Sequence, residues 1–336
     1  MKDEHHIAFA EDGEAARWNY RPERPVALNP LFQGPLDLKA VARWYAAYWF
    51  AASTTTLAIV LALVAYFLIL PPLEEMQSLA IGWMARVWLA NLVPHCVIAG
   101  LLHMWLYHWR KQGSLTKFDP RDPARDNGTY TFRNQVRDNM FWTIASGITL
   151  WTVAQWGVFW AMANGWAPRV FFPDNLVWFV LMFPFLVVWS SFHFYWVHRF
   201  LHWPPAYRVA HALHHRNVNI GPWSGISMHP LEHLVFYTNF LIHLIVPSHP
   251  IHVLFHGYMQ SVHPVFSHCG FEKLYVADKD RAKMGDFFHQ LHHRYFECNY
   301  GTIEMPWDKW FGSFHDGSEA ATRETRARKK KKMYGT

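Results

Sequence analysis

The chain of 336 residues has few cysteines and lacks the usual motifs for holding a redox cofactor. Its three cysteines, Cys96, Cys269 and Cys298, form no Cys-x-x-Cys pair, so we expect free thiols rather than a disulfide framework or an iron–sulfur cluster. There is no His-Pro-Gly-Gly haem signature and no Gly-x-Gly-x-x-Gly motif after a strand. The sequence therefore shows no motif for a haem, a dinucleotide or an iron–sulfur cluster.

Several other classes are disfavoured by what the chain lacks. The first 44 residues are polar and contain no apolar core, so we expect no cleavable signal peptide. We find no internal repeat. The net charge of +6 includes a basic run near the C-terminus, but no basic, aromatic-interleaved soluble domain accompanies that run. Nucleic acid is therefore not an expected partner.

Long apolar runs are abundant, and 51% of the residues are hydrophobic, with 19 tryptophans. A bilayer-crossing helix needs about 20 mostly apolar residues, and tryptophan is enriched at membrane interfaces. Four segments satisfy this length, and they cover residues 45–70, 83–107, 140–163 and 176–197. The sequence thus predicts an all-α integral membrane protein with about four transmembrane helices.

The distribution of Lys and Arg predicts the orientation of these helices. Six precede the first span, none lies in the loop 71–82, seven lie in the loop 108–139, and one lies in the loop 164–175. Sixteen follow the fourth span. Because cytoplasmic loops carry an excess of Lys and Arg, both termini are predicted to be cytoplasmic.

A fifth apolar stretch, residues 234–258, is interrupted by Pro247 and Pro250, and each half is too short to cross a bilayer. We expect a re-entrant or interfacial helical pair there. The predicted organisation has four parts. These are a cytosolic N-terminal segment 1–44, a transmembrane hairpin with a basic cytosolic loop 45–139, a two-span domain with a cytosolic histidine-rich helical cap 140–315, and a basic cytosolic tail 316–336.

Histidines after the fourth span are spaced as ligands of metal ions. They form the groups His198-x-x-x-His202, His211-x-x-His214-His215 and His289-x-x-His292-His293. Residues three and four apart lie on one face of a helix, so each group directs its imidazoles the same way. Eight imidazoles exceed the ligand number of one ion, which predicts two metal ions. Imidazole alone suits zinc, copper, nickel or iron.

The segment HRFLH, HALHH, HPLEH and HQLHH, followed by Asn299-Tyr300-Gly301 and by Trp307-Asp308, resembles the fatty acid hydroxylase/sterol desaturase superfamily. The resemblance covers roughly residues 140–315. It implies four-span membrane enzymes with a cytosolic, histidine-bound di-iron centre that uses O₂. The implied ligands are His198, His202, His211, His214, His215, His289, His292 and His293, together with His268 of a short His-x-Gly-like segment.

Further residues are candidates for supporting roles. His263, His229 and His233 stand near the ligand positions, and whether they bind metal is left open by the sequence. Glu232, in the segment HPLEH, is expected to hold the tautomer of a ligand imidazole. Asp286 and Asp308 have two interpretations, as supports of the metal site or as a helix cap and a surface charge.

The resemblance implies an oxidoreductase that hydroxylates or desaturates C–H bonds of a membrane lipid with two iron ions and O₂. A sterol-like substrate is favoured over a fatty acyl one by HPLEH. The electron donor would be separate, of the cytochrome b5, ferredoxin or reductase type. An ether-lipid monooxygenase on the same scaffold is an alternative, and a membrane metal transporter or a non-catalytic scaffold is an alternative of another class. The sequence does not indicate the oligomeric state.

Overall fold

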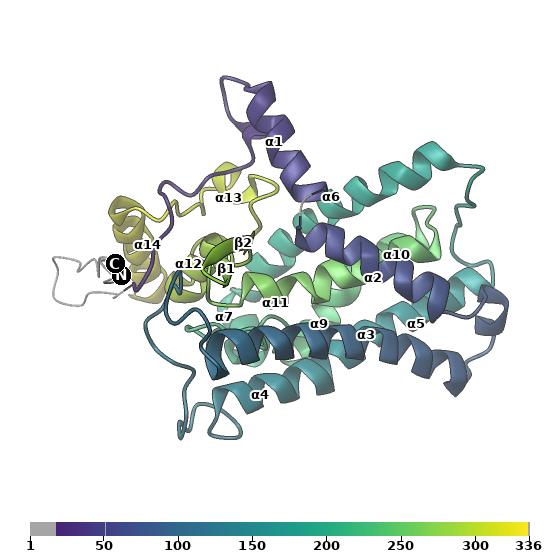
Figure 1. The fold of residues 1–336 in the computed structure, drawn as a ribbon, viewed down its shortest axis with the longest axis horizontal. Coiled ribbons are helices and arrows are strands. Elements are labelled where there is room, and N and C mark those ends of the chain that lie inside the picture. The colour runs from purple at the N-terminus through teal and green to yellow at the C-terminus, as the bar shows by residue number, and fades with distance from the viewer. Residues whose placement is uncertain (1–17, 51, 335–336) are drawn as a thin grey trace.

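The computed structural model describes residues 18–50 and 52–334, and most of them are helical (Figure 1). Long helices run side by side, and shorter helices gather at one end of this bundle. The first six α-helices are α1 (Leu38–Trp49), α2 (Thr54–Leu68), α3 (Ile81–His103), α4 (Gln135–Trp142), α5 (Thr149–Ala163) and α6 (Leu176–Leu201). The remaining α-helices are α7 (Pro204–Ala206), α8 (Ala212–His215), α9 (Pro230–Phe236), α10 (Pro250–Ser261), α11 (His263–Ser267), α12 (Phe287–Tyr295), α13 (Trp307–Trp310) and α14 (Glu319–Tyr334).

Short helical segments of other types extend or link these helices. The π-helical segments, which often mark functional sites, are η3 (Met104–His108), η4 (Thr143–Ile148) and η5 (Tyr207–His211). The 3₁₀ segments are η1 (Pro30–Phe32), η2 (Leu73–Met76) and η6 (Tyr237–Leu244).

Among the described residues, three helical stretches are long and apolar enough to cross a membrane: Leu38–Leu68, Ile81–His108 and Leu176–Leu201. The second and third coincide with the predicted spans 83–107 and 176–197. The first contains two helices, α1 and α2, where one span 45–70 was predicted. The second of them begins after Ser53, whose side chain accepts a hydrogen bond from the backbone N–H of Thr56. The arrangement agrees with a membrane protein.

The predicted span 140–163 is helical, but it is less apolar than the other three. The segments α4, η4 and α5 follow one another and together are long enough to cross a bilayer. Two polar side chains of this segment, Thr152 and Gln155, are hydrogen-bonded within the core. The Asn91 side-chain amide of α3 donates to Thr152 (2.9 Å) and to Gln155 (2.7 Å). Four spans therefore stay a prediction.

The predicted helical pair at 234–258 corresponds to α9 with η6, followed by α10 after the break at residues 245–249. Its second half is not exposed along the surface, since nearly every residue of α10 is buried. This helix packs against α2, α5 and α6 in the centre of the bundle. It leads into α11, so the core helix also positions the residues that follow it.

Gly257 lies where α10 approaches α5 closely. A Cβ atom added there would collide with the side chains of Trp151 and Gln155, both fully buried. We expect Gly257→Ala to cost about 1–3 kcal/mol through overpacking and to lower the thermal unfolding midpoint in detergent. Gly157→Ala on α5 is the control, because its Cβ meets open space. Equal midpoints for the two variants would contradict this packing.

The all-α prediction was wrong for one element. Strands β1 (Lys273–Val276) and β2 (Lys279–Lys283) form an antiparallel hairpin. The turn residues Ala277 and Asp278 both have positive φ angles, of 51° and 58°, as in the type I′ turns that match the twist of paired strands. The turn lacks the Asn-Gly or Asp-Gly pair that usually signals such a hairpin.

The two predicted polar ends pack onto the short helices. Residues 1–17 of the predicted N-terminal segment and residues 335–336 of the tail lie outside the described residues. Trp18 packs edge-on against Phe287 at 5.0 Å between ring centroids, and the Arg294 guanidinium lies 3.9 Å from the Trp18 ring. The basic tail forms α14, which packs against α12. Both ends therefore cover the histidine-rich region.

Candidate metal centre

The first histidine pair lies at the end of α6. His198 is in the last turn of that helix, and His202 is its C-cap residue. Their four-residue separation places both rings on one side of the helix. The pair is buried, with 3% and 4% of the side chains exposed.

The second and third histidine boxes occupy short helices that face this pair. His211 ends the π-helical segment η5, and His214 and His215 lie in α8. The third box lies on α12, which starts at Asp286, whose side chain accepts from the backbone N–H of Phe288 (2.9 Å). Asp286 therefore acts as a helix cap.

All nine predicted histidines lie together, and they form two groups. Within each group the candidate ligand atoms lie within 4.8 Å of one another. The first group, of five, contains His198, His202, His211, His215 and His292. The second group, of four, contains His214, His268, His289 and His293.

The second and third boxes are each divided between the two groups. In the second box, His211 and His215 join the first group, while His214 points to the second. In the third box the division is reversed, because His289 and His293 join the second group and His292 joins the first. Helical geometry explains the division, since residues four apart share a side and the residue between them is rotated away.

Backbone carbonyl groups fix the tautomer of several of these imidazoles. His198 Nδ1 donates to the Tyr300 carbonyl (2.7 Å), and His292 Nδ1 donates to the Cys298 carbonyl (2.6 Å). In the second group His268 Nδ1 donates to the carbonyl of Pro264 at 3.0 Å. A carbonyl oxygen can only accept, so the proton lies on Nδ1 and Nε2 of each neutral ring is a lone pair.

These Nε2 lone pairs point at other imidazole nitrogens. The Nε2 atoms of His268, His289 and His293 lie 3.1–3.2 Å from one another. In the first group His292 Nε2 lies 3.0 Å from that of His215, and His198 Nε2 lies 3.1 Å from that of His211. Converging lone pairs repel one another unless a cation lies among them. The donor sets therefore fit metal ions that favour imidazole.

Glu232 holds one imidazole of the first group, as the sequence predicted. Its Oε1 lies 2.7 Å from His211 Nδ1, and both side chains are almost fully buried. Burial raises the pKa of Glu232 to about 8 and lowers the pKa of His211 to about 3, so the protein alone favours the neutral form of each. A cation at the histidines would favour the ionised carboxylate, which orients the ligand ring.

Asp308 supports the first group through the backbone. Its carboxylate accepts from the N–H groups of Tyr300 (2.8 Å) and Gly301 (2.7 Å), and from the Ser313 hydroxyl (2.6 Å). The side chain is 2% exposed, which excludes the surface-charge interpretation. The carbonyl of Tyr300 accepts the hydrogen bond from His198. By holding the backbone of Tyr300, Asp308 therefore positions this candidate ligand indirectly.

The three histidines whose role the sequence left open are not members of either group. His263 Nδ1 lies 2.7 Å from the Thr54 hydroxyl. His233 Nδ1 lies 2.8 Å from the Ser146 hydroxyl, and His229 Nδ1 accepts from the backbone N–H of Leu231, capping α9. Each thus has a packing or capping partner in place of the histidine cage.

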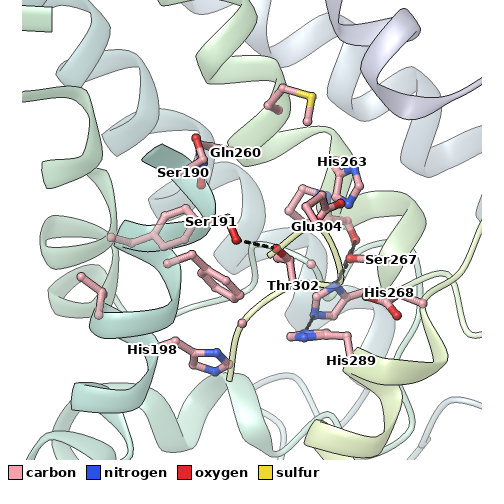
Figure 2. Close-up of a pocket in the computed structure, with 18 of the residues that line it drawn as sticks. Ser190, Ser191, His198, Gln260, His263, Ser267, His268, His289, Thr302 and Glu304 are labelled. Atoms are coloured by element: carbon pink, nitrogen blue, oxygen red, sulfur yellow. Dashed lines mark hydrogen bonds between the residues drawn. The ribbon is translucent and has the colours of Figure 1, made fainter. Parts of the chain in front are cut away.

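A cavity of about 990 Å³, part of which is open to the outside, adjoins the histidines. Much of its wall is apolar, and it includes Phe194, Phe236 and Met259. Both groups reach it, through His198, His211, His214, His268 and His289. Figure 2 shows His263 and Glu304 side by side, with His268 and His289 below them and His198 across the cavity. The site combines a candidate metal cage with space for a largely apolar molecule.

Comparison with known proteins identifies the family that the histidine-box segment resembles. Residues 183–313 match the family model named fatty acid hydroxylase. The chain carries a domain of the fatty acid hydroxylase/sterol desaturase superfamily. This confirms the resemblance inferred from the histidine boxes, and it covers all nine candidate ligands.

Curated relatives of this fatty acid hydroxylase domain are sterol desaturases by name. A Delta(7)-sterol 5(6)-desaturase of Eremothecium gossypii is 31% identical over 133 residues, which are 39% of this chain and 37% of that protein. Those of Aspergillus fumigatus and Saccharomyces cerevisiae are 31% and 33% identical, over 43% and 36% of this chain and 40% and 32% of theirs. The chain thus spans about two fifths of the length of these relatives. No solved structure matches it significantly.

The names of these relatives agree with the predicted oxidoreductase class. They also agree with the preference for sterol-like chemistry that the sequence indicated. Metal ligation by the nine histidines stays a prediction, although the structure gathers all of them. The supporting carbonyl groups of Tyr300, Cys298 and Pro264 were not predicted, because a backbone acceptor leaves no signal in the side-chain sequence.

Proposed function

We propose that the protein is an O₂-dependent di-iron hydroxylase or desaturase of a membrane lipid, with a sterol-like substrate favoured over a fatty acyl one. The observation that carries the proposal is the convergence of imidazole lone pairs from two histidine groups beside a largely apolar cavity. Support comes from the family of residues 183–313 and from the names of the curated relatives.

The nine histidines would hold two iron ions, one in each group. Bound iron would supply the O₂-dependent cleavage of an unactivated C–H bond, which no acid or base in the cavity can accomplish. Zinc, which has no redox chemistry, would not serve this reaction. The imidazoles act as ligands and not as general bases.

The remaining residues of the site would bind and orient the lipid. The apolar wall would hold the hydrocarbon part and keep water away from the histidines. His263 and Glu304 line the cavity beside each other and would receive a polar group, such as a hydroxyl, at that end. Fixing the polar group would place one C–H bond near the histidines. Holding the reacting groups in this geometry is how positioning contributes to catalysis.

We further propose that the protein crosses the membrane four times, with the histidine cap and both termini on the cytoplasmic side. The distribution of Lys and Arg along the chain supports this orientation. The cavity is lined by α6, one of the apolar helices, through residues such as Val187 and Ser191. A lipid would therefore approach the histidines from within the bilayer.

Turnover with defined lipids tests the proposal. The iron-loaded protein in lipid nanodiscs would receive O₂, a chemical reductant with a mediator, and either a Delta(7)-sterol, a phospholipid or a glycerol ether. Mass spectrometry should detect a sterol that has lost two hydrogens or gained one oxygen. Conversion of the acyl chain alone, or of the ether alone, would overturn the sterol preference. No oxidised lipid from any of the three would overturn the proposed function.

Loss of the Glu232 carboxylate should weaken metal binding in the first group. Glu232→Gln keeps the size of the side chain but removes the charge that orients His211, and such supporting contacts are typically worth 10–100-fold in metal affinity. Competition with a chelator, followed by elemental analysis, measures the change. Glu304→Gln is the matched control, because Glu304 lines the same cavity beside His263, which belongs to neither histidine group. An unchanged affinity in Glu232→Gln would contradict the orienting role.

A further inference from the structure

The histidine cage has two unlike sides. Five of the nine rings line the cavity, whereas His293 of the second group and three further rings, those of His202, His215 and His292, do not. Those three belong to the first group and are turned towards aromatic side chains. The substrate cavity therefore occupies one side of the cage and leaves the other side for a different role.

The aromatic layer on this second side is one ring thick. The Tyr300 ring lies 4.9 Å from the ring of His202 and 5.6 Å from that of His292, measured between centroids. The Phe296 ring lies 4.9 Å from that of His215. Electron tunnelling weakens steeply with distance, so a layer this thin favours electron transfer from the surface to the first group.

An open depression of about 770 Å³ lies on the outer side of Tyr300. Its lining comes from the end of α6, the segment after α12, the segment after α13, and α14. The lining residues are Arg199, Trp203, Glu297, Tyr300, Gly312, Ser313 and Arg328. Trp203 is 56% exposed, and exposed Trp beside Arg is typical of the anchor points of protein interfaces.

Positive charge surrounds this depression. The Arg199 guanidinium lies 6.0 Å from the Tyr300 ring, and Arg328 donates to the Gly312 carbonyl. The Lys329 ammonium lies 4.3 Å from the Phe296 ring, and Lys330 beside it is exposed. The nearest acid in the lining, Glu297, accepts a hydrogen bond from the Tyr300 hydroxyl (2.9 Å). The surface is therefore basic where Tyr300 and Phe296 contact the histidines of the first group.

We infer that this surface, formed by Arg199, Trp203, Arg328, Lys329 and Lys330, is the docking site of an acidic protein that carries one electron. The inference rests on the proposed function and adds a location and a partner chemistry to it. Electron-transfer complexes bury little surface, so a patch of this size suffices. Opposite charges would speed the encounter and fix the orientation of the carrier over Tyr300 and Phe296.

The redox step balances with the carrier alone. Each docking event would transfer one electron from the reduced cofactor of the carrier to one ferric ion held by the histidines, which becomes ferrous. Two docking events would reduce two ferric ions, and no proton transfer or bond cleavage is required. A lipid substrate in the cavity would be undisturbed, because it lies on the opposite side of the cage.

Binding of a defined probe tests the inference. The probe is the oxidised soluble domain of an acidic cytochrome b5, and its affinity for the purified protein in nanodiscs is measured by biolayer interferometry. In Lys329→Glu/Lys330→Glu we expect the affinity to fall about tenfold or more at low ionic strength, because like charges then meet across the interface. Added salt should reduce the wild-type affinity and shrink the difference between the proteins.

A second double variant provides the matched control. Lys279→Glu/Arg281→Glu changes the net charge by the same amount on the exposed strand β2, which is not part of the depression. Its affinity should stay within about twofold of the wild type. The stopped-flow oxidation rate of the reduced probe should follow the affinities, whereas reduction by dithionite should be equal in all three proteins.

Three results would overturn the docking site. These are no binding of the probe to the wild type, equal loss in both double variants, and equal affinity in all three proteins. Loss of binding to phosphatidylserine vesicles without loss of probe binding would also overturn it, since the surface would then contact a membrane. The proposed function fails separately, if elemental analysis finds no iron in the loaded wild type or if dithionite reduces none.

Discussion

Replacing His292 by alanine should lower the bound iron from about two ions per chain to one or fewer, and lower lipid oxidation by at least ~100-fold. The reason is the position of His292 within the first group. Its Nε2 lies 3.0 Å from that of His215, and its Nδ1 donates to the Cys298 carbonyl. Alanine removes one of five candidate ligands and leaves the Cys298 carbonyl without this donor. Elemental analysis of the purified, desalted protein measures the effect.

A histidine outside both groups provides the control. His193 lies on α6 five residues before His198, and its Nε2 contacts the Thr238 hydroxyl at 2.9 Å. His193→Ala should keep the iron content of the wild type. One zinc ion per chain in the wild type, or full iron in His292→Ala, would contradict the two-group cage. A thermal unfolding midpoint near that of the wild type would show that lost iron does not reflect an unfolded chain.

The second large effect is expected at Asp308. Its carboxylate accepts three hydrogen bonds in the buried turn that holds Tyr300. In Asp308→Asn the amide presents a donor where one backbone N–H needs an acceptor, which costs on the order of 3 kcal/mol. The thermal unfolding midpoint should fall by several degrees. The Tyr300 carbonyl should also shift away from His198, so that a chelator removes iron faster than from the wild type.

A nearby acid separates the role of Asp308 from a general loss of charge. Asp316 lies in the same C-terminal segment, and its side chain accepts from the backbone N–H of Ser318 (2.8 Å) without contacting the turn at Tyr300. Asp316→Asn should change neither the chelator rate nor the midpoint by a comparable amount. If Asp308→Asn loses stability but keeps the wild-type chelator rate, the turn does not position His198.

The sequence predicted the cage well because helical spacing controls it. Metal-like spacing in three boxes is a strong signal, and the residues four apart in each box share a group as expected. The expectation that all imidazoles of one box point the same way was wrong, because His214 and His292 turn to the other group. His268 was added by resemblance alone, since it stands outside any box. Its neighbours in space, His289 and His293, are more than twenty residues away along the chain, and only the tertiary fold brings them to His268 at the end of α11.

Less could be predicted where backbone groups support the site. The carbonyl groups of Tyr300, Cys298 and Pro264 orient three imidazoles, yet any residue offers the same carbonyl group. The hairpin of β1 and β2 was missed because its turn uses Ala277 and Asp278 in a conformation that glycine and asparagine usually adopt. Hydropathy also failed to separate α1 from α2, because the second half of α1 is apolar and was included in the predicted span 45–70.

Each histidine group takes ligands from both the second and the third box, so the two candidate metal sites depend on the same two helices. Neither site obtains its ligands from one box alone. Neither ligand set is therefore complete until α8 and α12 pack together. An insertion of one residue in either helix would rotate ligands out of both sites at once. Selection on the position of either helix therefore acts on both sites at once.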